Sequence, residues 1–321
     1  MLDVIGLGLV AMDVFFHVDD LPIEDGFALI LNSDFLPGGS GTNVIVQISR
    51  LSGKCGFMAQ VGDDSLGDGI KENLIIEKVD GKGIRTLPGA TSLNTKIVVD
   101  PNGRKFILLE KGTAFDQWSF TQADLVYLQQ ANVYYTDMLP PDPAFSGLQA
   151  AKQSGLKTVV NLQMGLDQMK MLGVSREAIL NSLKYVDIFA PCQHGFKQLC
   201  GSDDLDDCHK FIRNYFDNLL ICTIGEKGSI AYTNDNQKIF VPALPISAID
   251  TTGAGDSYLG GLIYANLIAQ KPLLYSMEFA TVCAGFTCER VGATASPYLP
   301  EAEDYLNSYQ SMFRSHNTIP E

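Results

Sequence analysis

The chain carries the sequence DTTGAGDS at residues 250–257, and an apolar run follows it at residues 258–269. Small residues at the start of a helix let free backbone N–H groups approach an anion, and the helix dipole favours negative charge there. The small residues of this turn are Gly253, Ala254 and Gly255. Asp256 stands directly behind them, where a carboxylate could take a proton from a hydroxyl beside a bound phosphate. The stretch therefore indicates phosphoryl transfer to a small molecule, although the same residue types also suit a plain turn and helix cap.

A second glycine-rich stretch, PGGSGTN at residues 37–43, precedes a segment with helical apolar spacing. The pair Gly38-Gly39 would let the backbone come close to a polyhydroxyl ligand, and Asn43 offers both a donor and an acceptor. Asp13 could accept hydrogen bonds from two neighbouring hydroxyls. Each residue also has a plain structural interpretation, as a turn, a helix cap or a solvated strand end. Together with the stretch at 250–257, we expect them to bind an acceptor.

Both stretches resemble signatures of the ribokinase-like (phosphofructokinase-B-type) carbohydrate kinases, in the order that the family has them. The N-terminal stretch matches residue for residue except at Ser40 and Thr42. Further matching landmarks are VGDDSLG at 61–67, TIGEKG at 223–228 and VGAT at 291–294. The resemblance extends from about Val4 to about Pro300 and is specific for the family but not for the substrate.

The resemblance implies transfer of the γ-phosphate of ATP to a hydroxyl of a ribose-type or ketose-type sugar. It assigns Asp256 as the catalytic base, the backbone at residues 253–256 as the anion hole, and Asp13, Gly38, Gly39 and Asn43 as sugar contacts. It assigns the nucleotide to a region that includes Thr223, Gly225 and Gly228. It also allows a monovalent cation such as K⁺ near Asp250, and a homodimer formed through the lid.

The sequence departs from the family where the family positions Mg²⁺. Many relatives have an Asn-x-x-Glu pattern after a central strand, whereas this chain reads PCQHG at residues 191–195. Cys192 and Gly195 stand at the matching spacing, and Gln193 is the speculative replacement in the magnesium shell. Mg²⁺ keeps several waters and binds partly through substrate phosphates, so the loss of one indirect carboxylate need not abolish catalysis.

The distribution of apolar segments predicts an α/β fold, in which strands alternate with polar-faced helices around a mainly parallel sheet covered on both faces. We expect a helix at residues 41–51, ended by Gly53. Two segments break the alternation: strands at 13–18 and 27–32, and a hairpin of 95–99 with 105–109. The family resemblance implies a three-layer α/β/α sandwich with these segments as a small β lid.

The expected boundaries follow from this assignment. The catalytic core comprises residues 1–12, 36–88 and 112–321, and the lid comprises residues 13–35 and 89–111.

Composition limits the function classes. The 321 residues are 46% hydrophobic, enough for a large core, and no apolar run has the length of a membrane span. The start of the chain lacks a secretory pattern, and the 7 cysteines form no Cys-x-x-Cys pair, so we expect a cytoplasmic protein without disulfides or structural zinc. A net charge of −14 without a basic cluster argues against nucleic acid as a partner.

Two other functions remain open from the sequence. A nucleoside or vitamin kinase of the same fold would share Asp256 and the glycine turn. A catalytically weak sugar-binding protein would explain the missing Asn-x-x-Glu pattern, although the intact Asp256 argues against it. A phosphorylated sugar would need cations in the lid, and Lys96, Arg104 and Lys105 are the candidates.

Overall fold

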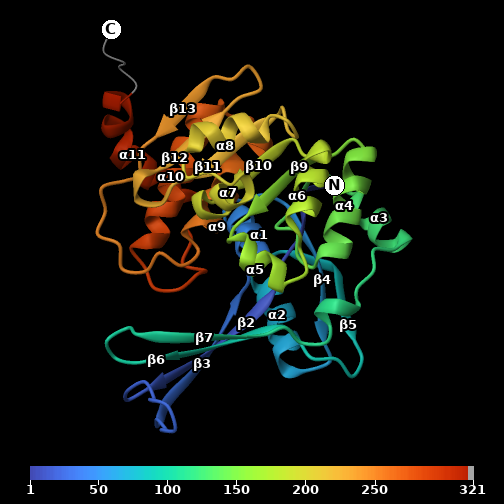
Figure 1. Cartoon of the computed structure of the whole chain (residues 1–321), viewed down its shortest axis with the longest axis vertical. Helices are drawn as coiled ribbons and strands as arrows, with labels where there is room; N and C mark the ends of the chain where they lie inside the picture. Colours follow the sequence, from blue (N-terminus) through green and yellow to red (C-terminus); the bar gives the residue numbers. More distant parts are fainter. Residues whose placement is uncertain (317–321) are drawn as a thin grey trace.

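A mainly parallel nine-stranded sheet forms the centre of the part of the molecule that the computed structural model describes, residues 1–316 (Figure 1). Its strand order is β13-β12-β11-β10-β9-β8-β1-β4-β5, and its antiparallel pairs are β11 with β12 and β12 with β13. The strands are β1 (Leu2–Leu7), β4 (Cys55–Gly62), β5 (Asp80–Leu87), β8 (Ala131–Thr136), β9 (Lys157–Leu162), β10 (Ile188–Pro191), β11 (Leu219–Thr223), β12 (Ser229–Tyr232) and β13 (Lys238–Val241). The predicted segment 112–321 ends in residues 317–321, which lie outside the described part.

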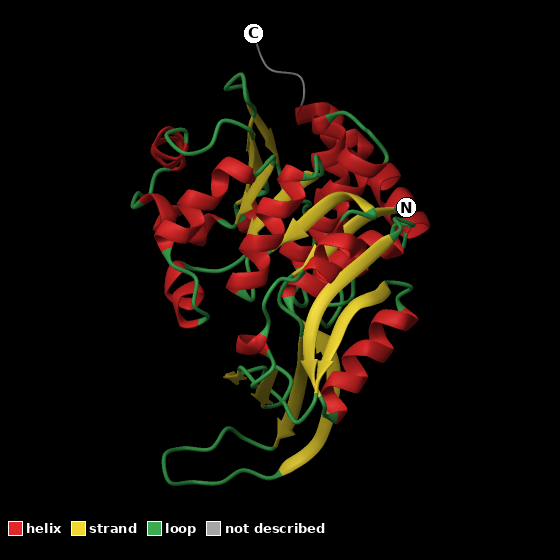
Figure 2. Ribbon diagram, turned by 90° about the vertical axis from the view of Figure 1, so that its right-hand side faces the viewer, coloured by secondary structure: helices red, strands yellow, loops and turns green. Residues whose placement is uncertain are grey.

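Helices cover both faces of this sheet, as the nearly continuous burial of strands such as β1, β4 and β8 requires. Figure 2 shows the helices packed against the strands. One face carries α1 (Ser40–Arg50), α2 (Ser65–Ile76), α9 (Ala254–Ile263), α10 (Leu273–Cys288) and α11 (Leu299–His316). The other face carries α3 (Gln122–Leu128), α4 (Pro141–Gln153), α5 (Leu166–Met171), α6 (Arg176–Ser182), α7 (Gln193–Cys200) and α8 (Leu205–Ile212). The apolar core is correspondingly split into two clusters, one on each side of the sheet.

Short helical turns complete the connections between these elements. They are η1 (Phe115–Gln117), η2 (Leu183–Tyr185), η3 (Gly225–Lys227) and the π-helical turn η4 (Tyr264–Ile268). The turn η4 continues α9 to residue 268, so the apolar run at 258–269 is helical over nearly all of its length.

A second sheet of four strands projects from the core and forms the lid, at the lower left of Figure 1. Its order is β3-β2-β6-β7, with β2 (Ala11–Val18), β3 (Ile30–Gly38), β6 (Asn94–Val99) and β7 (Lys105–Glu110). The predicted hairpin is confirmed: Gly103 has φ +78° and its N–H donates to the carbonyl of Asp100 at 3.0 Å. The fold class expected from the sequence, with core sheet and lid, is therefore confirmed.

Two local predictions were wrong, and the core strands β5, β12 and β13 were not predicted. The second lid strand spans Ile30–Gly38 rather than 27–32, because it is exposed along most of its length and gives little apolar alternation to locate it. Helix α1 ends at Arg50, and Ser52, not Gly53, takes the left-handed conformation, with φ +73°. The strand β5 was missed, because DGKGIRTL combines two glycines with alternating polar residues and carries a weak strand signal.

Candidate active site

The turn at residues 250–253 leads directly into α9, as the sequence predicted. Gly253 precedes the helix in the left-handed conformation, with φ +78°, and a Cβ there would stand 2.2 Å from the carbonyl oxygen of Ala293. Both the backbone angle and the close contact therefore require glycine. Apart from its chain neighbours and the backbone of the helix itself, no heavy atom of the described residues lies within 4 Å of the position that a Cβ on Gly255 would occupy. The start of α9 is open on the side of Gly255 and closed on the side of Gly253.

The Asp256 carboxylate lies at the first turn of α9 and receives two side-chain hydrogen bonds from α1. Ser40 Oγ donates to Asp256 Oδ1 at 2.6 Å, and Asn43 Nδ2 donates to Asp256 Oδ2 at 2.9 Å. Burial raises the pKa of Asp256 to about 6, and these two hydrogen bonds oppose the rise by stabilising the charged form. A carboxylate with this pKa is deprotonated at neutral pH and is still basic enough to accept a proton.

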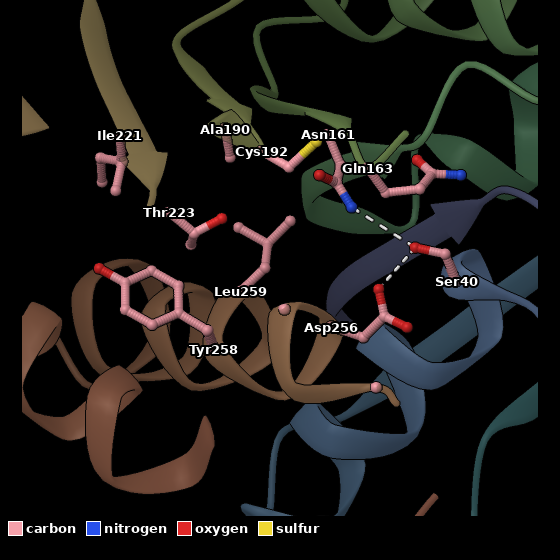
Figure 3. A pocket seen from close by; sticks show the side chains of 12 residues that line it. Ser40, Asn161, Gln163, Ala190, Cys192, Ile221, Thr223, Asp256, Tyr258 and Leu259 are labelled. Atoms are coloured by element: carbon pink, nitrogen blue, oxygen red, sulfur yellow. Dashed lines mark hydrogen bonds between the residues drawn. The ribbon is translucent and has the colours of Figure 1, made fainter. Parts of the chain in front are cut away.

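Asp256 forms part of the wall of a pocket of about 230 Å³. Figure 3 shows side chains from the ends of β9, β10 and β11 on one side and from α9 on the other. Its lining residues are Ser40, Asn161, Gln163, Ala190, Cys192, Ile221, Thr223, Gly253, Gly255, Asp256, Tyr258 and Leu259. The pocket thus lies outside the carboxyl ends of parallel strands, where open α/β sheets bind their ligands.

The predicted acceptor residues are held together near the junction of lid and core. The carboxylate of Asp13 on β2 accepts a hydrogen bond from Thr95 Oγ1 on β6, and burial outweighs that bond and raises the pKa of Asp13. A Cβ on Gly38 would stand 2.3 Å from Asp13 Oδ2. Gly39 has φ +94°, and a Cβ there would lie 2.4 Å from the carbonyl oxygen of Leu9. The two glycines therefore leave the Asp13 carboxylate uncovered and bring the start of α1 against the core.

Asn43 connects the two predicted halves of the site. Its amide nitrogen is engaged by Asp256, while its Oδ1 is buried and has no hydrogen-bond partner among the residues that the structure describes. An unpaired buried acceptor is costly unless a ligand supplies the donor. Asn43 can thus position Asp256 and still accept from a bound hydroxyl.

The residues predicted to bind the nucleotide lie in two places, one in the pocket wall and the others beyond it. Thr223, at the end of β11, lines the pocket. Gly225 and Gly228 begin and follow the turn η3, beyond the pocket lining. A Cβ on Gly228 would stand 2.1 Å from the carbonyl oxygen of Val241, so this glycine also has a structural role in packing β12 and β13.

In the segment 191–195, where the chain lacks the family's Asn-x-x-Glu pattern, Cys192 rather than Gln193 lines the pocket. Cys192 caps α7, with its Sγ accepting from the N–H of Gly195 at 3.3 Å. A Cβ on Gly195 would stand 2.5 Å from the carbonyl oxygen of Met164, so the glutamate found in relatives cannot be accommodated without moving that backbone. In addition, no group of three His, Cys, Asp or Glu side chains that could hold a metal occurs among residues 1–316.

Asp250 organises the turn before α9. Its Oδ1 accepts from the N–H of Thr252 at 3.0 Å and from Thr252 Oγ1 at 2.6 Å, and its Oδ2 accepts from the N–H of Gly292 at 3.0 Å. Burial alone would raise the pKa of Asp250, but these hydrogen bonds outweigh it and lower the pKa below its usual value. The carboxylate therefore links the turn to the segment 291–294, another of the matching sequence landmarks.

Sequence reasoning missed four polar residues of the site. Ser40 and Asn161 form a chain to Asp256, with Asn161 Nδ2 donating to Ser40 Oγ at 3.5 Å (Figure 3). Gln163 contributes a buried Oε1 that has no partner within the described part of the chain. Asp137 is fully buried, accepts from the N–H groups of Leu9 and Leu139, and has a pKa raised by burial to about 7. Only Ser40 gave a signal in the sequence, as a departure from the family pattern.

Comparison with known proteins identifies the family. A family model described as pfkB family carbohydrate kinase matches residues 1–301. The chain belongs to the pfkB family of carbohydrate kinases. This confirms the family and the ATP-dependent carbohydrate kinase activity that the two sequence signatures predicted.

Similar proteins in this family include enzymes for sugars and for nucleosides. The chain is 28% identical over 300 residues to probable fructokinase-2 of Arabidopsis thaliana, covering 88% of this chain and 90% of that protein. It is 27% identical over 290 residues to the aminoimidazole riboside kinase of Salmonella typhimurium, covering 85% and 88%. The structure of Arabidopsis thaliana ribokinase complexed with ribose and ATP has a TM-score of 0.81 at 18% identity, covering 95% and 98%. The last comparison confirms the fold.

Proposed function

We propose that this pfkB-family kinase transfers the γ-phosphate of ATP to a hydroxyl of an unphosphorylated ribose-type or ketose-type sugar, with Asp256 as the general base. The single observation that supports this best is the placement of Asp256. Its carboxylate has a pKa raised to about 6, lies at the wall of the pocket, and stands at the open start of α9. A base with these properties can accept the proton of an acceptor hydroxyl while the helix start holds the phosphoryl group.

Fewer backbone N–H groups are free to form the anion hole than the four expected from the sequence. The N–H of Ala254 donates to the carbonyl of Thr251 at 3.2 Å, and the N–H of Ser257 donates to the carbonyl of Gly253 at 2.8 Å. Of the four expected donors only Ala254 is engaged within the described residues, so the N–H groups of Gly253, Gly255 and Asp256 are the donors that we assign to the phosphoryl oxygens. Each well-placed donor of this kind lowers a reaction barrier by about 3–4 kcal/mol in comparable anion holes.

The acceptor would bind between Asp13, the backbone at Gly38 and Gly39, and the free Oδ1 of Asn43. Two hydroxyl groups can donate to the Asp13 carboxylate, which no side chain on Gly38 covers. The lid cations favour an acceptor without a phosphate. Lys96 pairs with Glu110, and Arg104 pairs with Asp20 and Asp100. The positive charge of Lys105 acts on the carboxylate of Asp250, so all three candidates already face a carboxylate.

The donor nucleotide would occupy the pocket beside Thr223 and extend toward Gly225 and Gly228. Mg²⁺ would neutralise phosphate charge there, and the oxygen donors in the pocket suit a hydrated magnesium ion. Gln163 Oε1, buried and unpaired within residues 1–316, can accept from a metal-bound water, and Asn161 offers a second amide oxygen nearby. These two residues replace Gln193 in our assignment. A monovalent cation such as K⁺ beside Asp250 remains a proposal, supported by the closely packed turn that this carboxylate organises.

The lid boundaries at residues 13–35 and 89–111 also remain a proposal, since β2 and β3 extend slightly beyond them into the core segments. We further propose that the lid forms a homodimer. Large apolar side chains are exposed on β3 and β7: Ile30, Leu31, Phe35, Leu36, Phe106, Ile107, Leu108 and Leu109. An exposed apolar sheet of this kind is a typical association surface, and a second copy would cover it symmetrically.

Two observations concern the surroundings in which the enzyme works. All seven cysteines are free, which supports the reducing cytoplasm as its compartment. Within residues 1–316, none of the helices combines the length and the apolar character that crossing a membrane would need.

The proposed function is tested by an acceptor screen with ATP and Mg²⁺. Fructose, ribose, their phosphates and adenosine are compared by ADP release, and each product is identified by phosphorus NMR. We expect a free sugar to be phosphorylated at the highest kcat/KM. Preferential turnover of adenosine would establish the nucleoside-kinase alternative. Binding of sugar without any phosphorylated product would contradict the assignment of a kinase active site.

A further inference from the structure

The hydroxyl of Ser40 makes the shortest of the contacts to the carboxylate of Asp256. Ser40 is the first residue of α1, and its Oγ lies 2.6 Å from Asp256 Oδ1 across 216 residues of sequence. Because a carboxylate oxygen can only accept, the hydroxyl proton must point at Asp256. Asn161 Nδ2 donates to the same Oγ at 3.5 Å, which agrees with a hydroxyl whose own proton is directed at Asp256 (Figure 3).

The arrangement suits a base that must remain accessible. Ser40 occupies one position on Oδ1 and Asn43 occupies one on Oδ2, whereas each carboxylate oxygen can accept two hydrogen bonds. One further position on each oxygen therefore remains for an acceptor hydroxyl. With both oxygens held, rotation of the carboxylate group is restricted. Hydrogen bonds to an ionised group are also roughly twice as strong as neutral ones.

We propose that Ser40 is a positioning residue for phosphoryl transfer, whose hydroxyl orients the Asp256 carboxylate and stabilises its deprotonated form. This role rests on the proposed function of Asp256. It also gives a purpose to the departure of this chain from the family signature at residue 40, since the bond to Asp256 needs a side-chain donor there. The neighbouring departure, Thr42, has a different contact: its Oγ1 approaches the carbonyl oxygen of Leu9 at 3.4 Å.

Two other titratable groups face Asp256, and both come from β8 or the residue after it. They are Tyr135 and Asp137, whose pKa values are raised by burial and, further, by the negative charge of Asp256. Within the described residues neither side chain donates a hydrogen bond to the Asp256 carboxylate, whose side-chain donors are Ser40 and Asn43, so neither replaces the hydroxyl of Ser40. Loss of that hydroxyl should therefore appear directly in the titration of Asp256.

The first test measures this titration without any substrate. Carboxyl carbons of the protein labelled with ¹³C at aspartate are followed by NMR against pH, and the Asp256 signal is assigned with Asp256→Asn. Ser40→Ala should raise the midpoint of Asp256 by about one pH unit, the size expected for one lost hydrogen bond to a charged group. Thr42→Val is the matched control, because it removes a hydroxyl from the same helical turn without touching Asp256. Its midpoint should equal that of the wild type.

The second test follows kcat against pH with the best acceptor from the screen. A base whose midpoint rises from about 6 to about 7 loses about fivefold in rate at pH 6 and almost nothing at pH 8. The KM values for ATP and acceptor should remain within a few-fold of the wild type.

These outcomes separate the inference from the proposed function. An unchanged Asp256 midpoint in Ser40→Ala, or an equal shift in Thr42→Val, would overturn the role of Ser40. A shifted midpoint in a protein that phosphorylates none of the acceptors would support the Ser40 contact and contradict the kinase assignment instead.

Discussion

The pocket around Asp256 and the exposed lid sheet differ in how their side chains are buried and paired. At the pocket, polar side chains from segments more than 200 residues apart are buried and bonded to one another, as in the contacts of Ser40 and Asn43 with Asp256. In the lid, strand β7 is exposed along its entire length, and the ion pairs Lys96–Glu110 and Arg104–Asp20 face solvent. Exposed pairs of this kind contribute only about 0–1 kcal/mol each.

This difference indicates which part of the site is already arranged in the absence of substrate. The groups that we propose as base and anion hole are held by the core without substrate, so the proposed chemistry depends on groups that are already in position. The lid presents apolar surface that neither the core nor its own sheet covers, so its final arrangement depends on the sugar or on a second subunit. Substitutions in the pocket should therefore change rates, whereas those in the lid should change binding and association.

The largest expected effect comes from Asp256→Asn. The change preserves size but removes the base, and general-base contributions are typically a hundred- to ten-thousand-fold in kcat. Acceptor affinity, measured by calorimetry, should remain within a few-fold of the wild type. The new amide can keep its oxygen toward Asn43 Nδ2 and place its nitrogen against Ser40 Oγ, because a hydroxyl can accept as well as donate, so the fold should tolerate the change. Turnover near the wild-type rate would remove Asp256 from the mechanism.

Asp13→Ala tests the proposed acceptor site, where the lid meets the core. Two sugar hydroxyls would lose their shared acceptor, at a cost of about 1–3 kcal/mol for each group left buried and unpaired. We expect the KM for the acceptor to rise at least tenfold, with a much smaller change in the KM for ATP. Steady-state kinetics with each substrate varied in turn provides the measurement. Equal losses for both substrates would place Asp13 outside the acceptor site.

Two glycines with positive φ, one in each region, compare the packing of the two regions. Gly39 has φ +94° and would bring a Cβ to 2.4 Å from the carbonyl oxygen of Leu9, whereas Gly103 in the lid turn has φ +78° and open space around it. Gly103→Ala should cost about 1 kcal/mol in the free energy of unfolding, for the left-handed conformation alone. Gly39→Ala should cost about 3 kcal/mol, because backbone must also move. Urea denaturation that gave equal losses would contradict the tight packing at the start of α1.

The smallest effect on the rate is expected from Ile107→Glu in the lid. Ile107 is 57% exposed, so the charged side chain should leave folding and kcat within a few-fold of the wild type while separating a lid-mediated dimer. Val126→Glu is the matched control, since Val126 on α3 is 54% exposed and lies outside the lid. Analytical ultracentrifugation should show that only Ile107→Glu lowers the oligomeric state. A wild type that is monomeric at all concentrations would contradict the proposed dimer.

The sequence predicted those parts of the site in which the same few residues determine both the backbone conformation and the chemistry. The small residues at 253–255 and the acid behind them predict an anion-binding helix start, because few other residue types suit that turn. The contact between Ser40 and Asp256 could not be predicted, since it depends on how α1 and α9 pack against each other. The lack of the family's glutamate at residue 195 could not be explained from the sequence for a similar reason: only the packed structure shows that the carbonyl oxygen of Met164 occupies the space a side chain there would need.

The central claim is that a carboxylate base with a raised pKa, Asp256, accepts the proton during phosphoryl transfer. The most direct measurement is the single-turnover rate constant for transfer from ATP to the acceptor, followed by rapid quench between pH 4.5 and 8. Because the base must be deprotonated, the rate constant should rise about tenfold per pH unit at low pH and level off above a midpoint near 6. A rate constant that stays flat across this range, with the enzyme folded throughout, would contradict the account.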